Sequence, residues 1–562
     1  MKHSISRGPG RCSTGAVLPA LLAGAALPFT APALAAPASP DVISIVLTPE
    51  VVGSRLQSLW IETRITGDAD GETKLLLPES DQTAAQWKSW SDIEVENAAI
   101  SGEGVERVLR HAPSAPITLR YRITQKSAVN FSNIVQPTYF SVLGAGVFFQ
   151  IDEREPEYRF QWGPLPTGWT VASDLDHETG DPSTPYPIST LYGGSDIILK
   201  EYPVGKGRLR LAMRNDSTLK PEFLGPLLGR IGKVSNELWQ DAGSDYLVTL
   251  TTLPDYKAQA GTGLGDAFAL YLPPDPDLLE LRNTLAHEYL HTWIGRRFGA
   301  GPRWFSEGFT QYYSPIVNLR AGSYSLSDFA AQWNAMLRSY AASPLRLTPA
   351  AQVEPVWRGT ADARQITENR SAMVAALMDY EISRQSKGKF RLADVMVEVK
   401  KDWDSKRGSG DGPTRIVAKA RQMAKVDLQP MIDRHLVRGE GLMLPNDVFG
   451  KCLTLVTVSD PKYERGFQVE GLGKPVTKVD PNSRAYAAGI REGMIVVARE
   501  GGKAGDSSVE NAYRVKDGAG ERVIRYLPTG RGTIQIQQVQ VKQGLKEKAA
   551  ERCARTLSGL RA

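Results

Sequence analysis

Two of the chain's six histidines, His287 and His291, stand four residues apart in "TLAHEYLHTW", with Glu288 directly after the first. On an α-helix, residues four apart lie on one face, so both imidazoles can point at one place. Two neutral imidazoles and one oxygen ligand suit a catalytic zinc ion, which keeps a position open for water. This HExxH spacing therefore predicts metal-assisted hydrolysis with Glu288 as the proton acceptor. The alternative is a pair of structural histidines on a partly buried helix.

A third ligand is available further along the chain. The segment "RWFSEGFTQYY" carries Glu307, and a carboxylate from a second helix would complete a three-ligand site. The alternative is that Glu307 is a surface residue or one that the helix dipole favours near a helix start.

The HExxH residues need a helix to carry them. Asp277 and Glu280 stand three apart, as in a capping box, and "LLELRNTLAHEYLHTWIGRRF" has helical apolar spacing. A Gly-Ala-Gly-Pro run over 299–302 is a stop signal. The pattern predicts one helix over residues 278–298.

HExxH followed by W-x-x-E-G-F resembles the gluzincin metallopeptidases, and "EGFTQYYSPIVNLRAGSYSLSDF" is similar to the glycyl aminopeptidase family. That family joins an N-terminal β domain, a thermolysin-like catalytic domain and a C-terminal PDZ domain. The resemblance implies one zinc ion per chain, held by His287, His291 and Glu307. It also implies Glu288 as general base, peptide substrates and aminopeptidase activity.

Two segments depart from the family pattern. Where the family has a G-G-L-E-H-like stretch, expected to hold the free amino terminus of a substrate, this chain has "GTGLGDAFALYLPP". Gly263 and Leu264 fit, Gly265 replaces the glutamate, and Asp266 either offers a displaced carboxylate or is a turn residue.

The second departure concerns the oxyanion. The family carries a tyrosine in a Y-x-K-G segment, and here "TENRSAMVAAL" places Glu368, Arg370 and Ser371 at those positions. Losing one oxyanion donor typically lowers the rate by about 10²–10³. Possible substitutes elsewhere, each with a core or surface alternative, are Tyr312, Tyr313 and Tyr380.

The C-terminal part resembles a PDZ domain through "VDPNSRAYAAGIREGM". Gly466 and Phe467 stand where its carboxylate-binding loop would be, so backbone N–H groups there could capture the terminus of a peptide ligand. The alternative is an ordinary hairpin turn in a structural lid.

Residue patterns predict an α+β multidomain protein. We expect a signal peptide at 1–35 and an N-terminal β-sandwich at 36–175. A mostly helical catalytic domain at 176–445 and a PDZ-like β domain at 450–548 follow. The net charge of +5 is small for 562 residues and mixed in sign along the chain, which argues against nucleic-acid binding.

The first 35 residues have a basic start, an apolar stretch and a small-x-small site ending at Ala35, which predicts a cleaved secretory signal. An uncleaved membrane anchor is the alternative. We expect a periplasmic or secreted protein without membrane contact after cleavage. Cys452 and Cys553 then remain, and in an oxidising compartment they form either a disulfide or two free thiols.

The expected function is that of an exported zinc metallopeptidase, an aminopeptidase acting on peptides or unfolded proteins. The alternative is a weakly active or inactive relative that serves as a peptide-binding scaffold through the PDZ-like domain. A lipid or glycan hydrolase built on the same metal site is a third possibility.

Overall fold

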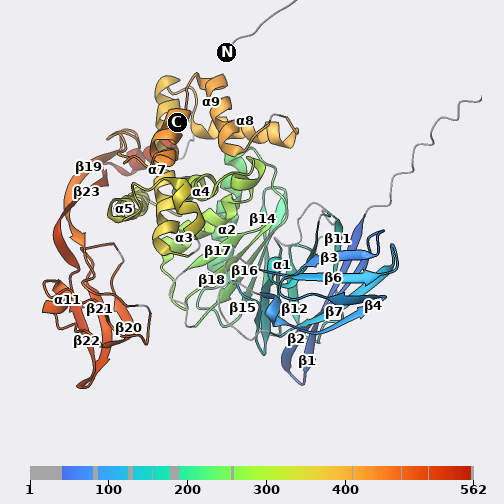
Figure 1. Ribbon diagram of the computed structural model, residues 1–562. Coiled ribbons are helices and arrows are strands. Elements are labelled where there is room, and N and C mark those ends of the chain that lie inside the picture. Colours follow the sequence, from blue (N-terminus) through green and yellow to red (C-terminus); the bar gives the residue numbers. More distant parts are fainter. Residues whose placement is uncertain are drawn as a thin grey trace, which may run out of the picture. The chain divides into compact units, whose positions relative to one another are not determined.

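The computed structural model describes residues 41–557 except 80–85, 125–130, 153, 155, 177–188, 255–258, 358, 408, 470 and 504 (Figure 1). The predicted signal peptide and its cleavage at Ala35 lie outside the described residues. No helix in the described part of the chain is both long and apolar enough to cross a bilayer.

The N-terminal region is a β-sandwich. Alternating apolar residues, such as Ile43, Ile45 and Leu47 in β1, turn one face of each sheet inward. The inward faces of the two sheets share one hydrophobic core. The five-stranded sheet consists of β11 (Glu157–Trp162), β1 (Val42–Val52), β2 (Arg55–Thr66), β7 (Pro116–Ile123) and β4 (Trp90–Glu96). The second sheet consists of β10 (Gln150–Ile151), β3 (Glu72–Leu76), β6 (Glu106–His111) and β5 (Ala98–Ser101).

A third sheet joins this region to the central region, which begins at β14 (Ile197–Val204). It consists of β12 (Thr170–Ser173), β13 (Thr190–Gly194), β9 (Tyr139–Leu143) and β8 (Ile134–Val135). The Tyr192 hydroxyl of β13 donates to the Leu250 carbonyl in the next sheet. Strand β13 therefore continues the N-terminal β region beyond the expected boundary at residue 175.

The central region opens with a mixed five-stranded sheet. Its order is β14 (Ile197–Val204), β15 (Gly207–Arg214), β16 (Tyr246–Thr252), β18 (Ala267–Leu272) and β17 (Ala260–Gly263). Strands β15, β16 and β18 run parallel, while β17 pairs antiparallel with β18 and is an edge strand. Strand β16 is buried along its whole length except at Thr252.

Helices follow and share one large core with this sheet. They are α2 (Pro221–Leu238), α3 (Leu278–Leu290), α4 (Arg303–Arg320), α5 (Leu326–Ala342), α6 (Ala350–Val353), α7 (Ala361–Gln385), α8 (Leu392–Asp404), α9 (Gly412–Ala424) and α10 (Gln429–Ile432) (Figure 1). The mixed α+β architecture is as expected from the sequence.

Helix α3 is shorter than the single helix expected over 278–298. It ends at Leu290, and a kinked π-type segment, Trp293–Arg297, follows. Within that segment Ile294 is extended (ψ 122°) and Gly295 has φ +86°, a left-handed value that favours glycine. Apolar periodicity continues through the kink, so the pattern alone does not reveal the break.

The C-terminal part contains a long antiparallel ribbon of two strands, β19 (Leu453–Tyr463) and β23 (Thr529–Val541) (Figure 1). The Asn334 side chain of α5 accepts from the Val539 N–H (2.6 Å) and donates to its carbonyl (3.1 Å). Beyond the ribbon, β20 (Ile495–Gly501), β21 (Asn511–Asp517), β22 (Gly520–Tyr526) and the short α11 (Arg484–Ala487) surround a core of their own.

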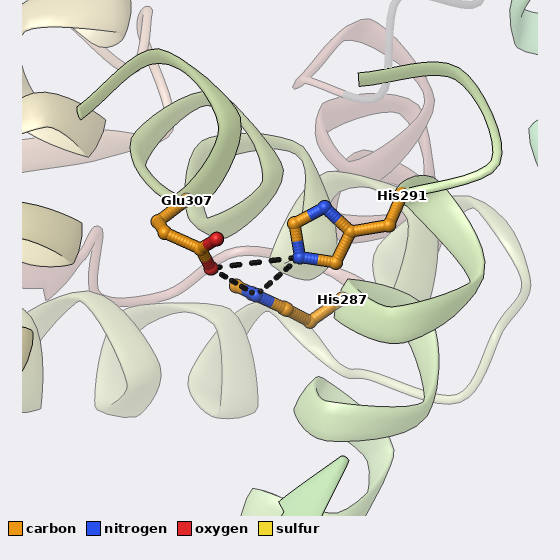
Figure 2. A group of neighbouring side chains, drawn as sticks. All are labelled: His287, His291 and Glu307. Carbon is orange, nitrogen blue, oxygen red and sulfur yellow. Dashed lines mark hydrogen bonds and ion pairs between the residues drawn. The ribbon is translucent and has the colours of Figure 1, made fainter. Parts of the chain in front are cut away.

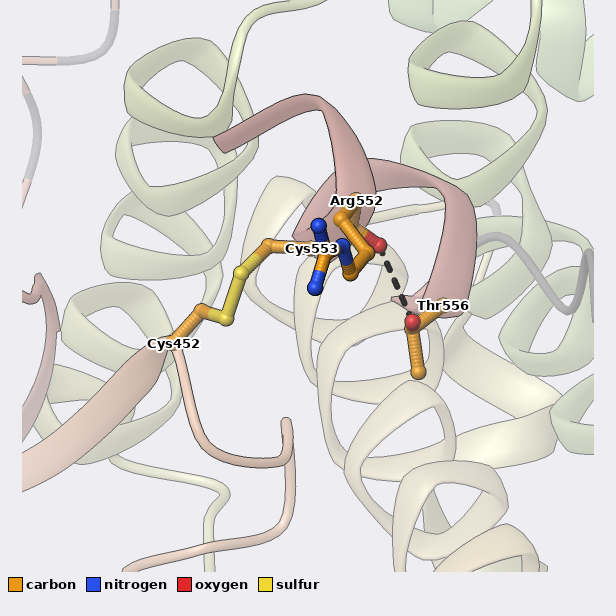
Figure 3. Close-up of a disulfide and its surroundings, with 4 residues drawn as sticks. All are labelled: Cys452, Arg552, Cys553 and Thr556. Atoms are coloured by element: carbon orange, nitrogen blue, oxygen red, sulfur yellow. Dashed lines mark hydrogen bonds between the residues drawn. A yellow bond between two sulfur atoms is a disulfide. The ribbon is translucent and has the colours of Figure 1, made fainter. Parts of the chain in front are cut away.

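A disulfide joins Cys452, at the start of the ribbon, to Cys553 of the last helix, α12 (Glu547–Leu557) (Figure 3). Helix α12 packs on α4, and the buried Cys553 belongs to the large core of the central region. The bond therefore ties both ends of the C-terminal part to the central region.

Replacing both cysteines, as in Cys452→Ser/Cys553→Ser, is expected to lower the free energy of unfolding by about 2–5 kcal/mol, because the bond closes a long loop. The two positions are 101 residues apart. Denaturant unfolding of the variant beside the oxidised wild type measures this. Equal unfolding midpoints would show that the bond does not stabilise the fold.

Candidate active site

Helix α3 carries both histidines. Asp277 caps it by accepting from the backbone N–H groups of Leu279 and Glu280, at 2.8 and 2.9 Å. His287 lies in its last turn and His291 at its C-terminal cap, so the expected one-turn spacing holds despite the earlier end of the helix.

The kink after α3 brings the third residue back to the histidines. A Cβ on Gly295 would lie 3.0 Å from the Ser306 side chain, so the chain at the kink approaches α4 beside Glu307. Asp241 holds this turn by accepting from Trp293 Nε1 (2.9 Å) and from Arg297 (2.5 Å). The short connection between His291 and Glu307 is therefore long enough to bring Glu307 back to the two histidines.

The three candidate ligands point at one another (Figure 2). His287 Nε2 lies 3.2 Å from His291 Nε2 and 3.3 Å from Glu307 Oε2, and the third distance is 3.5 Å. Ligand atoms about 2.0–2.1 Å from a tetrahedral zinc ion stand about 3.4 Å apart. In the described part of the chain these residues are the one group of three with metal-binding geometry. The donor set and spacing fit zinc.

Gln311, one turn after Glu307 on α4, orients the first imidazole. His287 Nδ1 lies 3.3 Å from Gln311 Oε1, which also accepts from Asn283 (3.2 Å). A carbonyl oxygen only accepts, so the proton sits on Nδ1 and Nε2 is left for the metal. Reasoning from the sequence missed Gln311, although its spacing of four from Glu307 is a signal that could have found it.

Gln311→Leu is expected to weaken zinc affinity about 10- to 100-fold, the usual effect of removing a partner behind a metal ligand. Gln311→Glu should keep the affinity, because a carboxylate accepts the same N–H. Competition with a chelator measures both, and the exposed Gln352→Leu is the control. Equal affinity in Gln311→Leu and wild type would remove Gln311 from the site.

Glu288 is buried beside the histidines, 7% exposed. Burial raises the pKa of its carboxyl, and the Gly263 N–H hydrogen-bonds to it and partly offsets that shift. A Cβ on Gly261 would lie 2.4 Å from Glu288 Cγ, so only glycine lets β17 lie this close to α3. Glu288 is thus held between helix α3 and the edge strand β17.

The charges of the site favour a cation. Burial disfavours the imidazolium of His287, but the Glu307 hydrogen bond and the charges of Glu288, Glu307 and Glu368 outweigh it and raise its pKa to about 9. Burial would raise the pKa of Glu307, yet the two imidazoles hold it well below its usual range. The surrounding carboxylates thus stabilise positive charge at this point, which a bound dication would supply.

Glu368 lies at this site, although its sequence position is on the distant α7. Helix α7 crosses α4 so closely that a Cβ on Gly308 would lie 2.1 Å from Ser371 Cβ. Glu368 is one turn before that crossing, and Glu307 directly precedes Gly308. Burial and the charges of Glu307 and Glu288 raise the pKa of Glu368 to about 7, against the lowering effects of His287 and Arg364.

Gly263, Leu264 and Asp266, which were expected to bind substrate, make structural contacts of their own. The Gly263 carbonyl accepts from Arg296 Nη2 (2.8 Å), a contact that sequence reasoning missed, and Leu264 is buried in a core cluster. Asp266 accepts from Ser244 Oγ (3.3 Å), and its backbone carbonyl accepts from the Leu247 N–H. Of these, Gly263 hydrogen-bonds to Glu288 through its backbone N–H.

The tyrosines considered as oxyanion donors have other contacts. The Tyr312 hydroxyl donates to Asp379 (2.8 Å), and the buried Tyr313 ring packs edge-on against Trp239. Tyr380 interacts with Asp447. Arg370 donates to the Thr348 carbonyl (2.5 Å) on the far side of α7 from Glu368.

Gly466 and Phe467 lie in the C-terminal part. The Gly466 carbonyl accepts from the Asp480 N–H, and Phe467 is buried edge-on against Tyr513. Gln468, directly after them, pairs with Thr477. The loop is well ordered by these contacts, and peptide binding there stays a prediction.

Comparison with known proteins bears on this site. Residues 280–373 match the model of the M61 glycyl aminopeptidase family. A search among curated proteins finds no relative of this chain.

Two solved structures are similar to the chain. An aminopeptidase N family protein from Idiomarina loihiensis is 14% identical, with a TM-score of 0.67 over 91% of this chain and 100% of that chain. An M1 zinc metallopeptidase from Deinococcus radiodurans is also 14% identical, with a TM-score of 0.47 over 72% of this chain and 94% of that one. The first of these shows a shared multidomain fold.

The matched segment contains both histidines, Glu288, Glu307 and Glu368. The family implies zinc, and the observed group of two histidines and a glutamate is suited to it. The chain is therefore a metallopeptidase, and the segment that carries its site is of the M61 glycyl aminopeptidase type.

Proposed function

We propose that the protein is an exported zinc aminopeptidase, which removes residues from the free amino terminus of peptides or unfolded proteins. The observation that carries the proposal is the triangle of His287, His291 and Glu307 ligand atoms with the Glu288 carboxyl buried beside it. One zinc ion per chain would be held by these three side chains.

The chemistry follows from the residues present. When bound, zinc supplies a Lewis acid that polarises a carbonyl and acidifies a water. Glu288 takes the proton of the attacking water onto its carboxylate and later passes it to the leaving amine nitrogen. Its burial between α3 and β17 keeps the carboxyl pointing at one place and raises its proton affinity, which suits a general base.

Export is part of the proposal. The signal-like residues 1–35 and the Cys452–Cys553 disulfide both suit an oxidising compartment outside the cytosol. Amino-terminal sequencing of the mature protein should begin just after Ala35. A mature chain that starts at Met1 would contradict export through this signal.

A panel of peptides tests the activity. Each peptide is offered in two forms, with a free amino terminus and with an acetylated one, to purified protein of measured zinc content. We expect about one zinc per chain and release of amino-terminal residues from the free form. Chelation should abolish turnover, and added zinc should restore it.

The panel also separates the alternatives. Cleavage of acetylated peptides at internal bonds would show an endopeptidase. Peptide binding without turnover by the zinc-loaded protein would overturn the proposal in favour of a scaffold that uses its PDZ-like part.

A further inference from the structure

Three carboxyl groups interact electrostatically with the His287 imidazole, and one of them has no part in the chemistry proposed above. Glu307 is a candidate zinc ligand and Glu288 the candidate base. Glu368 acts on the same imidazole, yet in the described structure it is outside the metal-binding group. The further inference concerns this third carboxyl and rests on the proposed aminopeptidase function.

The position of Glu368 is set by rigid packing. Helix α7 runs from Ala361 to Gln385, and Thr360 caps it by accepting from the Ala363 N–H. The tight Gly308–Ser371 crossing fixes α7 against α4 one turn away from Glu368. A long helix locked at such a crossing holds a side chain more precisely than a loop would.

Charge indicates what Glu368 can bind. An ionised carboxyl only accepts hydrogen bonds, and it repels the negative oxygen that forms on a scissile carbonyl. It attracts an ammonium group. Three carboxylates at one site carry one more negative charge than a zinc ion of charge +2 can balance. A substrate with a free α-amino group would neutralise that excess, whereas an acetylated substrate would not.

The strand side of the site has lost the group expected for this task. Gly265 replaces the glutamate there, and Asp266 accepts from Ser244 Oγ. Arg364 lies one turn before Glu368 on α7. The carboxylate missing from the strand is thus matched by one gained on α7.

We propose that Glu368 binds the α-ammonium group of the substrate, so that selection of free amino termini has moved from the edge strand β17 to helix α7. Glu368 would then be a specificity-determining residue in contact with substrate.

Kinetics on a matched pair of peptides tests this proposal. For zinc-loaded Glu368→Gln we expect kcat/KM on the free-amino peptide to fall about 10- to 100-fold, mostly through KM, because a charged hydrogen bond is lost. The acetylated peptide, which the wild type should cleave slowly or not at all, should be cleaved at the same low rate or faster. Glu368→Asp should keep part of the preference, since it keeps the carboxylate. Glu381→Gln is the matched control, because Glu381 pairs with Arg384 on another part of α7.

Several results would overturn the proposal. An equal change on both peptides, or no change, would show that Glu368 does not read the amino terminus. Loss of zinc in Glu368→Gln would make it a metal ligand. A higher kcat on both peptides in Glu368→Tyr, with the preference intact, would place position 368 at the oxyanion. If the wild type cleaves neither peptide, the proposed function itself fails, which is a distinct result.

Discussion

Glu288→Gln is expected to lower kcat by about 10²–10⁴-fold while zinc stays bound, because general base catalysis typically contributes that much. Glutamine keeps the shape of the side chain and still accepts the Gly263 hydrogen bond, but it cannot take a proton from water. The three candidate ligands are untouched. Steady-state kinetics together with metal analysis of the same sample measures both quantities.

The control for this variant is Glu280→Gln, which changes an exposed glutamate on the same helix α3. It should leave turnover near the wild-type value. Full activity in Glu288→Gln would contradict the assigned base. Loss of zinc in that variant would show instead that Glu288 is a ligand or holds the ligands in place.

Removing the carboxylate ligand should have the largest effect on the metal. We expect Glu307→Ala to bind zinc at least about 100-fold more weakly, because residues behind the ligands already account for 10- to 100-fold. The variant leaves two imidazole Nε2 atoms, 3.2 Å apart, without a third ligand atom. Zinc content after dialysis against a weak chelator should fall from about one per chain to near zero, and peptide hydrolysis should fall with it.

Glu354→Ala is a suitable comparison, since Glu354 pairs with Arg303 at the start of α4 without touching the triangle. It should retain zinc. Thermal unfolding of both variants separates loss of metal from loss of fold. Zinc retained at wild-type affinity in Glu307→Ala would disprove the three-ligand site.

Local spacing predicted that His287 and His291 share one helix face, and their Nε2 atoms lie 3.2 Å apart. The interval of four between His287 and His291 is a property of one helix, and the pair holds even though α3 ends at Leu290. The expected end of this helix was wrong, because the apolar periodicity continues through Gly295 whereas the regular α-helical backbone ends at Leu290. Periodicity reports which face is buried, and it does not report a single left-handed residue.

Other residues reach the site only through packing between distant segments. Glu368 is beside His287 because α7 crosses α4 at Gly308 and Ser371. Asp266, which is closer in the sequence, turns towards Ser244. Distance along the chain is therefore a poor guide to distance from the metal, since a close helix crossing depends on small residues that meet in space.

The sequence by itself indicated the candidate groups of the site: two imidazoles on one helix face, a carboxylate on the next helix, and a glutamate beside the first histidine. It left open whether Cys452 and Cys553 form a disulfide or stay as free thiols, and the structure joins them. Only the tertiary structure decided which carboxyl groups gather around the imidazoles, because helix-to-helix and helix-to-strand packing sets those distances. Short-range spacing is governed by backbone geometry common to all helices, whereas the positions of Gln311 and Glu368 depend on how this one core is filled.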